Sequence, residues 1–218
     1  MATTATRIEK DFLGEKAVPA DAYYGVQTQR ASENFPISGL RAPAPLVTAT
    51  VLVKQACARA NAEEGRLEPA IATAIVTAAD EILSGQLRDQ FVVDVYQAGA
   101  GTSHNMNTNE VLANRAGELL GEPKGTYTRV HPNDHVNMGQ STNDVFPTAT
   151  RLAILLILPE ARASAQALAD ALDRKARDFS SSASASRAAA RSTSGSTSRI
   201  ESRVADGNTS LVDCPMLT

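Results

Sequence analysis

The chain has 218 residues and a formal net charge of −3; 43% of its residues are hydrophobic, 4% are aromatic and none is tryptophan. This length allows one or two domains, and the apolar content is sufficient for a core. With so few aromatics, Ala and Leu must supply most of the packing, which favours helices over a β-sandwich. The slightly acidic balance argues against a basic surface for nucleic acid or for an anionic membrane.

The cysteine content and the apolar segments bear on the compartment. Cys57 and Cys214 are too few and too far apart for a disulfide framework or a metal site, which indicates a reducing environment. The N-terminal segment MATTATRIEKDF has no apolar signal core, and the longest apolar run, residues 152–158, is too short to span a bilayer. We therefore expect a cytoplasmic protein.

Helical patterns follow an irregular start. Residues 1–45 contain repeated Gly and Pro and are predicted to form an irregular arm. Ala-rich, apolar-periodic segments predict helices at residues 46–63 and 69–83. A third helix is predicted at residues 111–120, closed by Gly121 and Pro123, and a long fourth helix is predicted at residues 144–179.

The long helix and the segment after it do not match in character. Residues 152–158 (LAILLIL) are apolar nearly all round, which is typical of a helix inside a bundle. Residues 180–218 are rich in Ser, Arg and Ala, poor in large apolar side chains and without period, which predicts disorder. Either this is a native disordered tail, or a reading-frame shift or truncation has replaced the native continuation; the abrupt change favours the second explanation.

Two polar clusters carry the chemistry. GAGTSHNMNTNEV at residues 99–111 and HPNDHVNMGQSTNDVFPTATR at residues 131–151 are dense in hydroxyl and amide side chains, and each is predicted to precede a helix. Helix N-termini favour anions because their N–H groups are unpaired and the dipole is positive there. Simple capping explains one Ser or Thr per helix but not six or seven donors in each cluster. The clusters therefore predict a site for a small anion, most simply a carboxylate, held by neutral donors.

Three long segments carry a family resemblance. Residues 7–40 (RIEKDFLGEKAVPADAYYGVQTQRASENFPISGL), 89–116 (DQFVVDVYQAGAGTSHNMNTNEVLANRA) and 131–149 (HPNDHVNMGQSTNDVFPTA) resemble the aspartase/fumarase superfamily. The resemblance extends from about residue 7 to residue 179. The sequence of these segments is most similar to that of aspartate ammonia-lyases, since Ala100 stands where fumarases usually carry Ser and STND at 141–144 replaces the fumarase-like SSND. Class II fumarase is the alternative.

The resemblance implies a fold and an assembly. The expected fold is mainly α: an N-terminal lyase domain at residues 1–138, the first long helix of a central helical bundle at 139–179, and a disordered tail at 180–218. Full-length members form homotetramers in which three subunits share each active site. The reaction is an anti elimination that gives fumarate through an enediolate-like dianion, with ammonium leaving aspartate or water leaving malate. No metal or organic cofactor is implied.

The resemblance also assigns residues. Positions that grip the carboxylates of the dicarboxylate substrate, or support that grip, match Thr102, Ser103, Asn105, Ser141, Thr142 and Asn143. A second dicarboxylate site near the active-site entrance matches His131, Asn133 and Asp134. For that second site the residues leave an alternative open, in which His131 before Pro132 only fixes a turn.

The catalytic base of the family has no counterpart in this sequence. In family members this base is a serine on a loop of the type GSSxMPxKxN. A separate segment of the type GRTHxQxA also belongs to the family pattern. Neither pattern occurs in the chain. The sequence thus predicts half a substrate site with no turnover of its own. The rival hypothesis is a non-catalytic dicarboxylate-binding module or an interaction subunit that joins full-length relatives.

Overall fold

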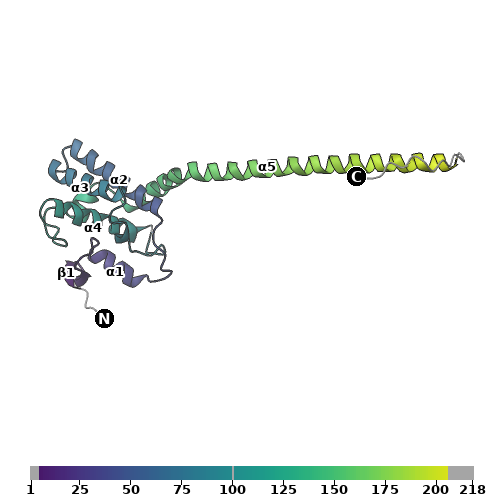
Figure 1. Ribbon diagram of the computed structural model, residues 1–218. Helices are drawn as coiled ribbons and strands as arrows, with labels where there is room; N and C mark the ends of the chain where they lie inside the picture. Colours follow the sequence, from purple (N-terminus) through teal and green to yellow (C-terminus); the bar gives the residue numbers. More distant parts are fainter. Residues whose placement is uncertain (1–4, 100, 206–218) are drawn as a thin grey trace. The chain divides into compact units, whose positions relative to one another are not determined.

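The structure, a computed structural model, describes residues 5–99 and 101–205 and is mainly α-helical, as the composition predicted (Figure 1). The chain forms two compact units, Met1–Pro159 and Glu160–Thr218. The candidate site lies entirely in the first unit, to which most of the following description applies.

The first unit begins with a β-hairpin rather than an irregular arm. Strands β1 (Thr6–Asp11) and β2 (Gly14–Pro19) pair antiparallel, with Asp11 opposite Gly14 at the turn. Gly14 has φ +111°, a conformation that L side chains rarely adopt, so it permits the turn instead of only interrupting structure. Helix α1 (Val26–Asn34) follows. The prediction of an irregular arm over residues 1–45 is wrong because the turn residues were read as breaks alone.

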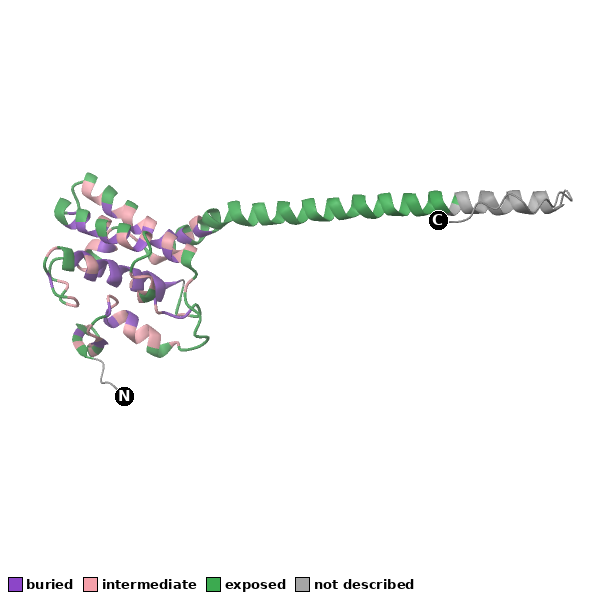
Figure 2. Cartoon of the chain, in the orientation of Figure 1, coloured by how far each residue is buried: buried purple, intermediate pink, exposed green. Residues whose placement is uncertain are grey.

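Three helices build the core. Helix α2 (Ala44–Glu63) packs against α3 (Pro69–Leu83), which packs against α4 (Thr102–Leu119), and Figure 2 shows their facing surfaces as buried. Small and branched aliphatic side chains fill the contact, as the aromatic-poor composition required. Its fully buried members include Val51, Ile75, Ala78, Ile82, Val111, Leu112 and Ala116. The short helices η1 (Arg88–Gln90) and η2 (Pro132–Val136) join this frame.

Helix α4 starts nine residues earlier than predicted. The first polar cluster does not precede the helix but forms its first two turns, with Gly101 as the N-cap. Asn and Thr have low helix propensity, which hid these turns from the sequence pattern. In the structure all of these polar side chains except that of the exposed Thr102 are buried, and tertiary contacts outweigh that low propensity.

Helix α5 (Thr142–Ala205) contributes to both units. In the first unit, its residues Val145, Ala149 and Ala153 are buried, and Ala149 and Ala153 pack with Ala49 of α2. The apolar side chains that follow, Ile154, Leu155, Leu156, Ile157 and Leu158, are exposed. Over Thr142–Ala189 the helix has the length and hydropathy of a membrane span, a property that core helices of soluble bundles share.

The structure differs from the expected disordered tail over residues 180–205, which α5 continues as a helix; residues 206–218 lie outside the described residues. Ala and Arg are among the strongest helix formers, so the backbone can remain helical where no core is buried. The side chains described between Ser180 and Ala189 are all exposed.

Candidate functional site

The start of α4 lies directly against the first turns of α5. Gly101 has φ +79°, and a Cβ atom added to it would lie 2.1 Å from the ring of Phe146. Only glycine therefore allows this approach, because both the backbone conformation and the missing side chain are needed. The His104 ring also meets Phe146, with centroids 6.3 Å apart. The two polar clusters, far apart in sequence, thus converge.

Hydrogen bonds from the Asn105 side chain join the two clusters. The Asn105 amide Nδ2 donates to Thr142 Oγ1 at 3.2 Å and to Asn137 Oδ1 at 3.2 Å. Because the Thr142 oxygen accepts from Asn105, its own O–H remains available to donate to another group. Among the described residues Thr142 makes no other side-chain hydrogen bond. The geometry leaves a hydroxyl donor at the first turn of α5.

The six predicted carboxylate-binding residues lie at the two helix starts. Thr102 and Ser103 open α4, Thr142 and Asn143 open α5, and Asn105 links the helices. Ser141 precedes α5 and its Oγ accepts from the Asn143 N–H at 3.3 Å, a capping contact. Thr102, Ser141 and Asn143 are exposed, whereas Ser103 and Asn105 are buried. Ala100 lies outside the described residues.

Behind Thr142 lies a buried lysine that the sequence patterns did not single out. Lys54 on α2 is fully buried, and its Nζ donates to Asn137 Oδ1 at 2.7 Å and to Gln140 Oε1 at 2.9 Å. Burial lowers the pKa of the Lys54 ammonium to about 7, an effect that the nearby Cys57 partly opposes. The sequence held one signal of this residue, a lysine within an apolar helical pattern, because charged residues are rarely fully buried without a role.

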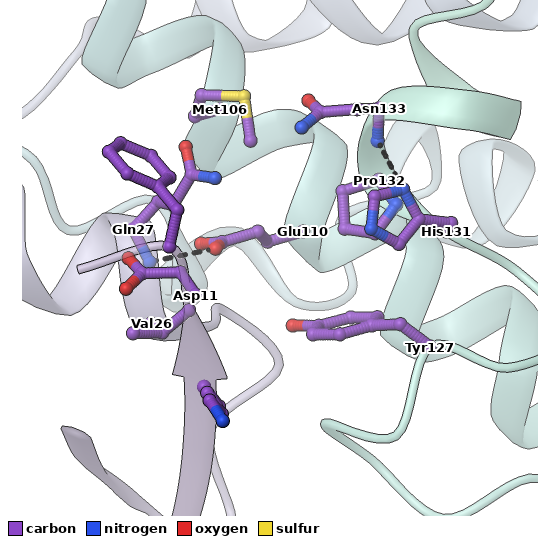
Figure 3. A pocket seen from close by; sticks show the side chains of 11 residues that line it. Asp11, Val26, Gln27, Met106, Glu110, Tyr127, His131, Pro132 and Asn133 are labelled. Carbon is purple, nitrogen blue, oxygen red and sulfur yellow. Dashed lines mark hydrogen bonds between the residues drawn. The ribbon is translucent and has the colours of Figure 1, made fainter. Parts of the chain in front are cut away.

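The predicted second site borders a cavity of about 200 Å³ between the hairpin, α1, α4 and η2 (Figure 3). Of its three residues, His131 and Asn133 line the cavity, and the exposed Asp134 does not. The His131 Nδ1 accepts from the backbone N–H groups of Asn133 and Asp134 at 3.3 and 3.2 Å. These contacts give His131 the turn-fixing role that the sequence left open as an alternative.

A second feature missed from sequence is the carboxylate of Glu110, which also borders this cavity. Although fully buried, it accepts the backbone N–H groups of Gly25, Gln27 and Thr28 at 2.9 to 3.0 Å and so serves the start of α1 from a distant position in the chain. Burial raises the pKa of Glu110, and the bonds from α1 oppose that shift. No local sequence pattern predicts such a contact, because the partners of Glu110 are more than 80 residues away in the chain.

Within the described ranges, no group of three or more His, Cys, Asp or Glu side chains is arranged to hold a metal ion. The site is instead built from hydroxyl and amide groups at two helix starts, with one buried ammonium behind them. Such a set donates hydrogen bonds to an anion without introducing a fixed negative charge.

Comparisons with known proteins identify the family. The lyase family profile matches residues 14–191. The chain is 54% identical over 176 residues to the aspartate ammonia-lyase of a Bacillus species, covering 81% of this chain and 38% of that protein. It is 55% identical over 174 residues to the class II fumarate hydratase of Halobacterium salinarum, covering 79% and 37%. The chain therefore spans less than two fifths of the length of these relatives.

Solved structures with similar folds belong to the same group of lyases as these sequence relatives. The native crystal structure of a protein described as fumarate lyase:delta crystallin, from Brucella melitensis, superposes with a TM-score of 0.68 at 56% identity, over 70% of this chain and 36% of that one. A recombinant class II fumarase from Schistosoma mansoni gives 0.66 at 42% identity, over 69% and 32%. From these matches and from the profile, the chain belongs to the lyase family, within the aspartase/fumarase superfamily.

Proposed function

We propose that this chain supplies the carboxylate-binding part of an aspartate ammonia-lyase-type active site, and that alone it binds a small dicarboxylate without turning it over. The observation that carries this proposal is the Asn105–Thr142 hydrogen bond, which joins two helix starts and leaves the Thr142 hydroxyl free to donate. The identity of 54% to an aspartate ammonia-lyase supports it.

The chemistry of such a site explains the neutral donors. In the proposed reaction a base removes the proton from the carbon beside one carboxylate of L-aspartate, and the electron pair spreads into that carboxylate as an enediolate-like dianion. The electron pair then forms the C=C bond as the C–N bond breaks, the protonated amino group leaves as ammonia, and fumarate remains. Hydroxyl donors at Thr102, Ser103, Ser141 and Thr142, with Asn143, strengthen their bonds as this negative charge grows. A preorganised neutral set follows the shift of charge with little rearrangement.

Water elimination from malate is the second candidate. It is favoured by a specific observation: the identity to a class II fumarate hydratase, 55%, is as high as that to the aspartate ammonia-lyase. Elimination of ammonia is preferred because residues 141–144 read STND, the sequence that aspartate ammonia-lyases carry at this motif. Both reactions use the same carboxylate donors.

The proposed setting is a cytoplasmic homotetramer in which α5 is a bundle helix and not a membrane span, without an organic cofactor, a metal or nucleic acid. The apolar side chains of α5 from Ile154 to Leu158 are exposed in this chain, which supports the proposal that they pack against other helices in the tetramer. His131, Asn133 and Asp134 are proposed to form a second dicarboxylate site beside the cavity of Figure 3, whose lining contains Lys10 as a cation together with the carboxyl groups of Asp11 and Glu110.

Calorimetry with succinate, an unreactive dicarboxylate, tests the proposal. We expect binding that Thr142→Val weakens about tenfold, because one hydrogen bond to a charged group is lost. A matched control, Thr73→Val, removes an exposed hydroxyl that only donates to its own helix, to the Pro69 carbonyl, and is expected to change nothing. Formation of fumarate from aspartate or malate, followed by absorbance, is expected to stay at background.

Two results would contradict the proposal. Equal affinity of the wild-type chain and the Thr142→Val variant for succinate would remove Thr142 from the site. Fumarate production by the pure chain would show that the base is not missing, and the ratio of rates with aspartate and malate would then decide between the two leaving groups.

A further inference from the structure

The buried ammonium of Lys54 has hydrogen-bond partners but no counter-ion among the described residues. Both of its acceptors, Asn137 Oδ1 and Gln140 Oε1, are neutral amide oxygens, and no carboxylate in the part of the chain that the structure describes lies within ion-pair distance. A fully buried cation without a paired anion destabilises a fold compared with an apolar side chain of similar size. Core packing alone therefore does not explain a lysine at this position.

As an ammonium, Lys54 can only donate, and in this charged form it sets the direction of every bond beyond it. Asn137 must present its oxygen to Lys54, so its Nδ2 faces the Gln140 carbonyl, at 3.1 Å. The same Asn137 oxygen also accepts from Asn105 Nδ2 at 3.2 Å, and Asn105 must therefore present its NH₂ group. The second hydrogen of that group goes to Thr142 Oγ1 at 3.2 Å.

The orientation that this network imposes on two amide side chains leaves their buried oxygen atoms unpaired within the described ranges. The Oδ1 atoms of Asn105 and of Asn109, whose Nδ2 also reaches Asn137 Oδ1 at 3.3 Å, are buried without a partner among the described residues. Leaving a buried carbonyl oxygen unpaired is unfavourable. Both amides nevertheless turn their NH₂ groups to the same oxygen. Convergence of three donors on Asn137 Oδ1 is thus the dominant feature of this network.

We propose that Lys54 is a positioning residue of the carboxylate site: through Asn137 and Asn105 it fixes the Thr142 oxygen as an acceptor and so aims the Thr142 hydroxyl hydrogen at the ligand. The inference rests on the function proposed above for Thr142. If Lys54 is replaced by a residue that does not donate, the two amides are free to flip and Thr142 no longer has a fixed direction.

A double-mutant cycle with succinate distinguishes positioning from a role in folding. We expect Lys54→Met to weaken succinate binding about tenfold, as Thr142→Val does, and the double variant to bind no more weakly than either single variant. Lys124→Met is the control: this lysine donates to the Asp21 carbonyl at 2.8 Å, away from the site, and its loss is expected to leave binding unchanged. Full additivity of the two losses would overturn the proposal.

A second variant covers the case in which Lys54→Met does not fold. Asn137→Ala removes the link while Lys54 keeps Gln140 as an acceptor. Circular dichroism first establishes that each variant is folded. Asn137→Ala is then expected to lose binding to the same extent, and wild-type affinity in this variant would overturn the proposal.

A measurement without ligand separates this inference from the proposed function. In ¹⁵N-edited NMR spectra, the Asn105 side-chain NH₂ signals are expected to be dispersed and protected from exchange in the wild type and to lose protection in Lys54→Met. If the wild-type chain binds no succinate but these signals respond, the proposed function fails and the positioning role stands. If succinate binds and the signals do not respond, the positioning role is wrong.

Discussion

At the scale of single residues, burial decides which side chains of the polar clusters can titrate. His104 is 1% exposed, and its Nε2 lies 3.0 Å from Thr50 Oγ1, which itself donates to the Leu46 carbonyl. The His104 ring therefore donates to Thr50, and its Nδ1 has no partner among the described residues. Burial, and next the charge of Lys54, lower the pKa of His104 to about 4. The ring is a neutral packing group near neutral pH.

This buried histidine predicts a dependence of stability on pH. In the unfolded chain His104 takes up a proton below its ordinary pKa of 6.5, whereas in the folded chain it stays neutral down to about 4. The unfolded state then binds more protons, so the free energy of unfolding falls as the pH is lowered from 6.5 to 4, by up to about 3 kcal/mol from this group. Urea titrations across this range are expected to show a smaller fall for His104→Gln. Parallel curves for variant and wild type would contradict the account.

Residue types in the sequence pointed to the proposed site more clearly than to the charged residues packed near it. Thr102, Thr142 and Asn105 belong to polar stretches that stand out in the sequence, and the structure brings the two stretches together. Lys54 and Glu110 were missed because each lies in an otherwise ordinary helical pattern. Their partners are distant in sequence, and only the folded chain shows that the charged groups are enclosed.

At the scale of elements, the site depends on how closely two helices approach. Ala-rich periodicity predicted α2 and α3 to within two residues, because their apolar stripes report the core directly. The start of α4 and the hairpin could not be read in this way, since polar helical turns and glycine turns lack that stripe. The approach of α4 to α5 at Gly101 is a tertiary fact with no local signature beyond the glycine itself.

Two glycines with the same backbone conformation offer a matched test of this approach. Gly101 has φ +79° and Gly121 has φ +80°, but a Cβ atom meets the Phe146 ring at Gly101 and open space at Gly121. Gly121→Ala is expected to cost about 1–2 kcal/mol from the backbone alone. Gly101→Ala adds a clash of about 1–3 kcal/mol and separates the helix starts, so succinate binding is also expected to be lost. Chemical denaturation and calorimetry on both variants measure this; equal losses of stability with binding retained would refute it.

At the scale of the whole molecule, the chain has a packed N-terminal frame and a long helix, and the large apolar side chains described in that helix from Ile154 onward are exposed. In the first unit Ala149 and Ala153 of α5 are buried, and the exposed apolar run begins one residue later. Beyond Pro159 the described side chains of α5 are exposed as well. The helix itself was predictable from its period, whereas its continuation to Ala205 was not, because the side chains described between Ser180 and Ala189 are all exposed and no apolar period marks that part of the helix.

The starts of α4 and α5 are proposed to hold a carboxylate together through neutral hydrogen-bond donors. A crystal structure of this chain grown with succinate tests this arrangement. We expect one succinate carboxylate within hydrogen-bond distance of the Thr142 hydroxyl and of the Thr102 hydroxyl at the first turn of α4, with Asn105 still donating to Thr142. Succinate bound elsewhere, or Thr142 donating its hydrogen inward while both helix starts stay empty, would contradict it.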